Sequence, residues 1–228
     1  MSAFDAVIFD LDGVLVDTEI WWDEVRQAFA AANERAWTLD DRSAVMGANS
    51  RQWSATMAER LRISTAPEEI EAAVVGGMVA RYRGSSTPLI TGADAAVRRL
   101  AASHPLAVAS SAHADVIRAA LSATGLADAF RVVVSSDEVP RGKPEPDVYL
   151  EAARRLGVSP SACLVIEDSL NGVLAGERAG MTVVLVPNES VPPAPGAEEA
   201  ADVVLRDLSG LDPDAIVSVI AAGPEGRS

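Results

Sequence analysis

FDLDGVLVDT, from Phe9 to Thr18, joins a predicted strand to a pair of carboxylates. The apolar run that begins at Ala6 predicts a buried strand, and Asp10 and Asp12 follow two residues apart where that strand would end. Like charges about 4 Å apart repel by roughly 4 kcal/mol at an intermediate dielectric. The first strand therefore ends where some positive charge must offset this repulsion.

Six apolar runs of strand length recur along the chain, and helical patterns separate most of them. This alternation predicts an α/β fold, a doubly wound, Rossmann-like parallel sheet with helices on both faces. The expected strands are residues 7–9, 106–109, 131–134, 164–166, 183–186 and 203–205. The expected helices in this part of the chain are residues 93–103, 114–125, 147–157 and 170–181.

Residues 18–87 break this alternation, because they carry helical patterns and no strand pattern. The three patterns cover residues 19–34, 51–62 and 67–83. We predict that residues 1–17 and 88–228 form the catalytic core, and that residues 18–87 form a separate all-helical domain inserted after the first strand. The alternative is that these helices only pad one face of the sheet. Residues 188–200 are rich in proline and polar side chains, which predicts a surface loop.

Composition bears on the possible partners and location of the protein. A net charge of −14 disfavours nucleic acid and anionic membrane as partners, because both bind clustered Lys and Arg. We find no signal peptide pattern and no apolar run that approaches a membrane span. The single cysteine, Cys163, cannot form an internal disulfide, as is typical of a reducing compartment. We expect a cytoplasmic monomer that binds neither nucleic acid nor membrane.

Polar side chains follow several of the predicted strands at their carboxyl ends. Sites form at these ends in doubly wound sheets, because parallel strands all end at the same edge. Each such residue alone is weak support for a site, since these residue types also cap the helix after a strand. Together the set points to one site: Asp10, Asp12, Ser110, Ser111, Lys143, Glu167 and Asp168.

The spacing of the first two aspartates points both side chains to one side of an extended backbone. Asp168 would approach Asp10 and Asp12 from a neighbouring strand end, which gathers three or four carboxylates at one point. A hard divalent cation with oxygen ligands, Mg²⁺, offsets their repulsion, and Lys143 adds further positive charge. The sequence therefore predicts a Mg²⁺ site beside a lysine.

Four motifs stand in a fixed order along the chain: DLDGVLVDT, ASS, RGKPEPDVY and IEDSLNG. They resemble the four signatures of the haloacid dehalogenase-like hydrolase superfamily, and the resemblance covers essentially the whole chain. The helical insert stands where the phosphatase and β-phosphoglucomutase branch has its cap domain. The resemblance implies a Mg²⁺-dependent phosphatase of small phosphorylated metabolites, with sugar phosphates as the first candidates.

The resemblance also implies a role for each core motif. Asp10 would attack phosphorus and form a phosphoaspartyl enzyme, and Asp12 would act first as general acid and then as general base. Ser110 would hydrogen-bond the transferring phosphoryl group, and Lys143 would stabilise its charge.

The metal ligands are implied in the same way. The Mg²⁺ site would consist of the Asp10 and Asp168 carboxylates and the main-chain carbonyl of Asp12. Glu167 would join them directly or through water. Asp12 thus enters the metal site through its backbone, which leaves its carboxyl group for proton transfer.

Substrate contacts are expected from the cap. The motif MGANSRQ resembles the cap loop that faces the active site, so Gly47, Asn49 and Arg51 are candidates for substrate binding, together with Ser111 of the core. The competing interpretation is an ordinary helix N-cap at Asn49 or Ser50.

Two alternative functions stay open beside hydrolysis. The first is a β-phosphoglucomutase, which Trp22 disfavours because the mutases carry at that position a histidine that assists the sugar hydroxyl. The second is a phospho-aspartate switch, in which an aspartate, acidic metal ligands and a lysine also meet. A switch must preserve its acyl phosphate, so Asp12 and the insert disfavour it. Haloacid dehalogenases share the fold and the nucleophile but need neither an aspartate at the position of Asp12 nor a Mg²⁺ site. The two aspartates of the DLD motif therefore argue against a dehalogenase.

Overall fold

β1 lies at the centre of a parallel six-stranded sheet in the computed structural model, which describes residues 4–222. The strand order is β3-β2-β1-β4-β5-β6, so the chain moves outward on one side of β1 and then returns to the other side. This order confirms the predicted doubly wound fold. The strands are β1 (Ala6–Phe9), β2 (Leu106–Ser110), β3 (Val132–Ser135), β4 (Cys163–Glu167), β5 (Thr182–Leu185) and β6 (Val203–Val204).

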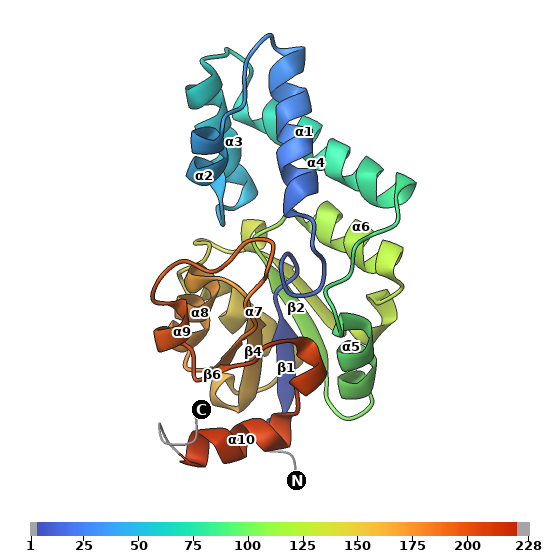
Figure 1. The fold of residues 1–228 in the computed structure, drawn as a ribbon, viewed down its shortest axis with the longest axis vertical. Helices are drawn as coiled ribbons and strands as arrows, with labels where there is room; N and C mark the ends of the chain where they lie inside the picture. The colour runs from blue at the N-terminus through green and yellow to red at the C-terminus, as the bar shows by residue number, and fades with distance from the viewer. Residues whose placement is uncertain (1–3, 223–228) are drawn as a thin grey trace.

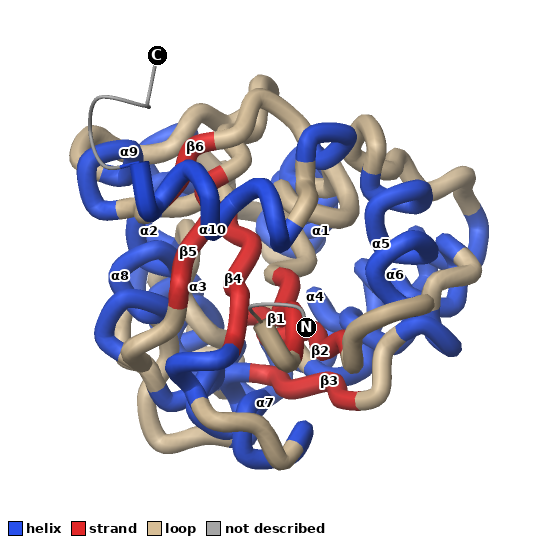
Figure 2. Tube along the Cα trace, turned by 90° about the horizontal axis from the view of Figure 1, so that it is seen from below, coloured by secondary structure: helices blue, strands red, loops and turns tan. Residues whose placement is uncertain are grey.

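Helices cover both faces of the sheet, as Figure 2 shows from below. Successive strand residues point to opposite faces, so Val7 and Phe9 belong to one apolar cluster and Ile8 to the other. The first cluster includes α5 (Ala93–Ala101), α6 (Ala114–Thr124) and α10 (Pro213–Ala222), and the second includes α7 (Asp147–Leu156), α8 (Leu170–Arg178) and α9 (Ala197–Ala200). Short 3-10 helices are η1 (Ala127–Ala129), η2 (Ser136–Glu138), η3 (Pro160–Ala162) and η4 (Leu208–Gly210).

The remaining helices lie together beyond the carboxyl ends of β1 and β2 (Figure 1). They are α1 (Glu19–Ala32), α2 (Leu39–Val45), α3 (Ser50–Leu61) and α4 (Pro67–Gly84). Their packing is apolar, since Trp53, Met57 and Ile70 are all at most 2% exposed. The two chain connections to the core lie side by side, because the Asp17 amide donates a hydrogen bond of 2.9 Å to the Pro88 carbonyl.

The structure differs from the sequence prediction at a few elements. Residues 18–87 hold four helices, whereas the sequence predicts three. The helix that the sequence misses is α2, which is short and buries only Val45, so that it has no apolar stripe to detect. Its start is fixed instead by a capping box, in which Thr38 and Asp41 exchange hydrogen bonds. The helices α9 and α10 were also not expected, and α9 lies within the predicted loop. None of the helices within residues 4–222 is long and apolar enough to cross a bilayer.

Candidate active site

Asp10 follows β1 directly, at the point where the strand order reverses, and is only 7% exposed. The Lys143 Nζ lies 2.5 Å from the Asp10 Oδ1 and 2.6 Å from the Glu167 Oε1. One lysine thus links the ends of β1 and β4, two neighbouring strands. Burial raises the pKa of Asp10 and the charge of Lys143 opposes this effect, so that the pKa is about 7.

Glu167, the last residue of β4, is fully buried and its carboxylate is saturated with hydrogen bonds. Its Oε1 accepts from Lys143 and from the Tyr149 hydroxyl at 2.7 Å. Its Oε2 accepts from the amides of Asp168 and Ser169, at 3.0 and 3.1 Å, and from the Ser169 hydroxyl at 3.0 Å. Burial would raise the pKa of Glu167, but Lys143 and the hydrogen bonds from Tyr149 and Ser169 together outweigh burial, and the pKa is lowered. Glu167 is therefore a fixed anion that holds the lysine.

The acidic cluster fits a hard cation. Single carboxylate oxygens of Asp10, Glu167 and Asp168 all lie within 4.8 Å of one another. The Asp168 carboxylate has no hydrogen bond among the described residues, and burial together with Glu167 and Asp10 raises its pKa well above the usual value. Three carboxylates against the single charge of Lys143 leave an excess of negative charge. Oxygen ligands of this kind are those that Mg²⁺ prefers.

Gly13 lacks a side chain where the Asp168 carboxylate needs space. It has a φ of +85°, and a Cβ there would lie 1.9 Å from the Asp168 Oδ2. Only glycine satisfies both conditions at low cost. The turn after the two aspartates therefore brings the backbone against the Asp168 carboxylate.

Asp12 differs from Asp10 in its partners. Its Oδ1 accepts a hydrogen bond of 2.7 Å from the Thr18 hydroxyl and one of 3.2 Å from the Trp22 indole N–H. Burial raises the pKa of Asp12, against the effect of these two donors. A carboxyl group with a raised pKa and one oxygen fixed in place is suited to hold and release a proton.

A cavity of about 270 Å³ unites most of the predicted core residues. Asp10, Asp12, Ser110, Ser111, Lys143 and Asp168 all line it. Ser110 ends β2 and is 1% exposed, and its Oγ accepts a hydrogen bond of 3.0 Å from the Ala112 amide. The strand ends that the sequence analysis singled out therefore meet at one cavity, and their roles stay a prediction.

The three predicted cap residues are placed differently from one another. Gly47 lines the cavity. The Asn49 side chain caps α3 by accepting a hydrogen bond of 3.0 Å from the Gln52 amide, and the Arg51 Nη2 donates to the Asp137 carbonyl at 3.1 Å. Neither Asn49 nor Arg51 is among the residues that line the cavity. The N-cap interpretation therefore describes Asn49, and substrate contact by Gly47 stays a prediction.

Several residues of the site escaped the sequence analysis. Thr18 contacts Asp12, Tyr149 contacts Glu167, and Glu19 and Arg26 line the cavity from α1. Thr18 ends the motif DLDGVLVDT and Tyr149 ends the motif RGKPEPDVY, so both residues belong to motifs that indicate the site. Glu19 and Arg26 sit in a helical pattern whose polar positions look like an ordinary solvated face.

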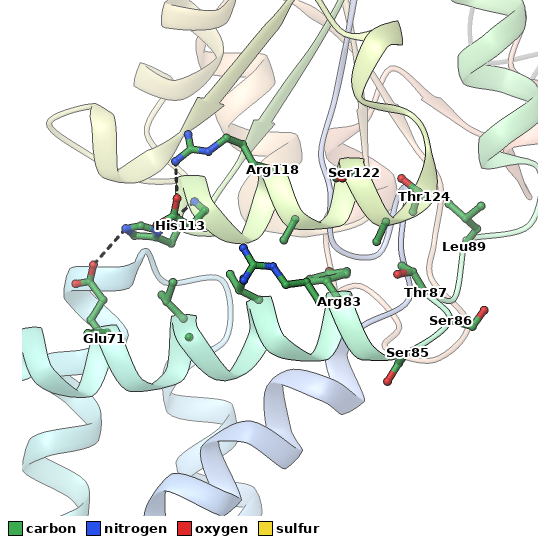
Figure 3. Close-up of a pocket in the computed structure, with 18 of the residues that line it drawn as sticks. Glu71, Arg83, Ser85, Ser86, Thr87, Leu89, His113, Arg118, Ser122 and Thr124 are labelled. Atoms are coloured by element: carbon green, nitrogen blue, oxygen red, sulfur yellow. Dashed lines mark hydrogen bonds and ion pairs between the residues drawn. The ribbon is translucent and has the colours of Figure 1, made fainter.

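A larger cleft of about 1230 Å³ lies between α4 and α6, as Figure 3 shows. Glu71 and His113 approach each other there, with 3.8 Å between Oε1 and Nε2. The residues that line this cleft include none of the carboxylates of the β1 and β4 ends. The smaller cavity is therefore the one lined by the predicted core residues.

The sequence model of the haloacid dehalogenase-like hydrolases matches residues 4–180. The chain belongs to this family. The predicted resemblance is thus confirmed, and with it the prediction of a hydrolase.

Several named proteins are similar to this chain over most of its length. The bifunctional riboflavin kinase/FMN phosphatase of Arabidopsis thaliana is 32% identical over 204 residues, 89% of this chain, and the chain spans about half (53%) of that relative's length. Hexitol phosphatase B of Escherichia coli is 30% identical over 216 residues, 89% of this chain and 90% of the relative. The crystal structure of a mutant of CbbY from Rhodobacter sphaeroides in complex with xylulose-(1,5)bisphosphate matches with a TM-score of 0.79 at 25% identity, and the match covers 91% of this chain and 96% of that one.

Proposed function

We propose that this chain is a Mg²⁺-dependent phosphatase that hydrolyses small phosphorylated metabolites, sugar phosphates in the first place, through a phosphoaspartyl intermediate. The observation that carries the proposal is a buried, lysine-held carboxylate, Asp10, beside a second carboxyl group of raised pKa, Asp12, in one cavity. The pair separates the two tasks that phosphate ester hydrolysis needs, a nucleophile and a proton donor.

In the first step Asp10 attacks phosphorus. Lys143 occupies its Oδ1, which leaves Oδ2 for the attack. As the bond from Oδ2 to phosphorus forms, the bond from phosphorus to the ester oxygen breaks, and the leaving oxygen takes the proton of Asp12. Ser110 and Lys143 lie in the same cavity and are placed to bind the equatorial oxygens of the phosphoryl group.

In the second step Asp12, now ionised, takes a proton from a water molecule as the water oxygen attacks phosphorus. The bond between phosphorus and Asp10 breaks, which releases phosphate and restores both carboxyl groups. Thr18 and Trp22 hold the Oδ1 of Asp12 through both steps. The other oxygen is left for the leaving group and then for the water.

Asp10 and Asp168, with the main-chain carbonyl of Asp12, would hold the Mg²⁺. When bound, the ion neutralises charge on the transferring phosphoryl group and on the carboxylates. Glu167 already accepts five hydrogen bonds, so we assign it to positioning: it holds Lys143 and accepts from the Asp168 amide.

The cap supplies the remainder of the cavity wall. We propose residues 18–87 as a lid that opens and closes about the adjacent connections near Asp17 and Pro88, because substrate must enter and product must leave.

The names of hexitol phosphatase B and of the CbbY complex support a small phosphorylated metabolite as substrate. We further propose that the protein acts as a cytoplasmic monomer.

A β-phosphoglucomutase-type activity is the second candidate, and Trp22 separates the two. Its indole N–H donates to Asp12 and cannot exchange a proton with a sugar hydroxyl as a histidine could. This favours hydrolysis.

The test is a screen of phosphorylated metabolites with and without Mg²⁺, with p-nitrophenyl phosphate as generic ester and Asp10→Asn as the inactive control. We expect Mg²⁺-dependent release of inorganic phosphate, and acid quench with mass spectrometry should find phosphate on Asp10 in the Asp12→Ala variant. Efficient conversion of β-glucose 1-phosphate to glucose 6-phosphate, in the presence of the 1,6-bisphosphate, would establish the mutase instead. Full activity in excess chelator would refute the metal site.

A further inference from the structure

Arg26 of α1 is a buried cation without an anionic partner. It is 7% exposed and it lines the active-site cavity from the cap side. Among the described residues it makes no hydrogen bond and no ion pair within 4.0 Å, and its Nε is buried with no acceptor. Buried charges in proteins are normally paired. The missing partner of Arg26 is therefore the observation to explain.

Two indole rings hold the Arg26 guanidinium in place. Its Cζ lies 5.0 Å from the ring centroid of Trp22 and 5.6 Å from that of Trp53. The two rings pack edge to face, with centroids 6.3 Å apart. Aromatic faces attract a cation but accept none of its N–H groups in strong hydrogen bonds. The rings thus fix the guanidinium and leave its hydrogen-bonding capacity free.

None of the nearby acids forms a hydrogen bond or an ion pair with the Arg26 guanidinium among the described residues. Glu19, Asp12 and Asp23 act on it only through longer-range charge, while Arg42 opposes them, and burial lowers the pKa of Arg26 to about 10. Arg26 remains charged at neutral pH all the same. Of these acids, Asp12 is the group that we assign to proton transfer, so its charge is not a permanent counter-ion.

The second cation of the cavity, Lys143, can be compared with Arg26. Lys143 also lines the cavity, and it is bound to Asp10 and Glu167. With a net charge of −14, the whole molecule repels anionic ligands, so an anion in this cavity must be bound by local cations. Arg26 is the lining cation that the described residues leave unpaired, and it lies on α1, whereas the reacting phosphate of the proposed function would bind to the core.

We propose that Arg26 is a specificity-determining residue that binds a second anionic group on the leaving-group end of the substrate. The preferred substrate is then a phosphate monoester whose far end carries a carboxylate or another phosphate. This inference rests on the proposed phosphatase function. The fork of N–H donors on the guanidinium matches either anion in a bidentate manner.

The first test compares three ligands that differ only at carbon 1. They are glucitol 6-phosphate, which is neutral there, 6-phosphogluconate, which carries a carboxylate, and glucitol 1,6-bisphosphate. We expect kcat/KM to be higher for one or both acidic ligands than for glucitol 6-phosphate, by about tenfold or more. Which acidic ligand leads shows whether the anion is a carboxylate or a phosphate.

Variants then assign the preference to Arg26. Arg26→Met keeps an apolar stem between the rings and should reduce the ratio of acidic to neutral kcat/KM to near one, chiefly through KM. Arg26→Lys keeps the charge but loses the fork, and should retain part of the ratio. Arg98→Met, at a surface position of α5 with a 59% exposed side chain, is the matched control and should keep the wild-type ratio.

A binding measurement serves as an independent readout. In the Asp10→Asn background the three ligands can be titrated without turnover, and the fluorescence of Trp22 and Trp53 should report occupancy of the Arg26 subsite. 6-Phosphogluconate or the bisphosphate should bind more tightly than glucitol 6-phosphate, and Arg26→Met should remove the difference. Circular dichroism of each variant shows whether it is folded.

The outcomes separate the two proposals. If the wild type hydrolyses glucitol 6-phosphate as well as the acidic ligands and binds all three equally, the Arg26 inference is wrong while the phosphatase stands. If Arg26→Met lowers all three kcat/KM values equally and shifts the pH profile, Arg26 acts on Asp12 and not on the substrate, and the inference is again wrong. If no ester is hydrolysed, including p-nitrophenyl phosphate, the phosphatase proposal fails, and the titrations still decide the subsite.

Discussion

Asp10 faces two opposing demands at the residue scale. As the proposed nucleophile it must be ionised, but it is buried beside Glu167 and Asp168. Lys143 offsets only part of the cost, so the pKa rises from the usual 3.8 to about 7. In the folded protein Asp10 binds its proton more tightly than in the unfolded chain. Its contribution to stability is therefore present below pH 3.8 and is lost as the pH rises toward 7.

We predict that Asp10→Asn abolishes turnover and stabilises the metal-free protein at alkaline pH. The amide keeps the shape of the side chain but has neither the nucleophilic charge nor its burial cost. In chelator at pH 8 the gain in the free energy of unfolding should be up to about 4 kcal/mol, because one pKa unit corresponds to about 1.4 kcal/mol, and it should shrink toward pH 4. Urea unfolding at both pH values measures it. Loss of all but a few per cent of kcat corresponds to about 2 kcal/mol of lost transition-state stabilisation. A variant that keeps more kcat than this would show that another residue attacks.

Most residues of the candidate site were predictable because they lie at the end of a strand or just after it. Asp10, Ser110 and Asp168 stand out as polar residues directly after or at the end of apolar runs, and parallel topology then brings them together. Arg26 was not predictable, because a helical arginine is solvent-exposed in most proteins. Its burial results from the packing of Trp22 against Trp53, which are far apart in the sequence.

At the scale of elements, the start of α8 determines the position of Glu167. Gly172 lies in the first turn of α8, and a Cβ there would be 1.8 Å from the Glu167 carboxyl carbon. Because Glu167 is fully buried and bonded to Lys143 and Tyr149, it has no room to move aside.

We predict that Gly172→Ala displaces Glu167, and with it Lys143, and lowers kcat by about a hundredfold or more. A steric clash with a buried carboxylate should also lower the free energy of unfolding by about 2–4 kcal/mol. Steady-state kinetics and urea unfolding measure the two effects. The matched control is Gly76→Ala in α4, where a Cβ would meet nothing within 4 Å, so that stability should rise by about 0.5–1 kcal/mol. A Gly172→Ala enzyme with normal kcat would remove Glu167 from the positioning role.

Prediction of elements from the sequence succeeded where burial produces a pattern. The strands of the sheet are apolar throughout, and α5 to α8 each present an apolar stripe to it. It failed at α2, where Val45 alone is buried, and at α9, which spans only four residues. A sequence pattern can reveal packing only where enough residues pack.

At the scale of the molecule, the proposed metal site would link the two sides of the switch point. Asp10 follows β1 and Asp168 follows β4, so a cation bound to both ties neighbouring strands together. A ligand that binds only the folded state raises the free energy of unfolding.

We predict that Mg²⁺ at about 100 times its Kd stabilises the protein by about 2.7 kcal/mol, which corresponds to a rise in Tm of about 5–10 °C for a chain of this size. Asp168→Asn removes one charged ligand, so most of this rise should disappear. Differential scanning calorimetry with and without chelator measures both. An equal Mg²⁺ shift in Asp168→Asn would place the cation elsewhere.

The proposed closure of the cap would depend on a contact between residues 18–87 and the core. The Asp137 Oδ1 accepts a hydrogen bond of 3.1 Å from the Ser50 amide at the start of α3, and the Asp137 carbonyl accepts from Arg51. A carboxylate at a helix N-terminus also interacts favourably with the helix dipole, by about 0.3–1 kcal/mol. We therefore expect this contact to stabilise the closed state of the proposed lid.

We predict that Asp137→Ala shifts the cap toward an open state and raises KM for a hexitol phosphate by about three- to tenfold, since loss of a partly exposed hydrogen bond costs about 0.5–1.5 kcal/mol. Inorganic phosphate is small enough to be held by core residues such as Ser110 and Lys143, so its inhibition constant should change less than KM does. Steady-state kinetics with phosphate as competitive inhibitor measures both constants. The control is Asp128→Ala in η1, an exposed acid outside this contact, which should leave both unchanged. If Asp137→Ala raises the two constants by the same factor, the residue acts on the core alone and the moving lid loses its support.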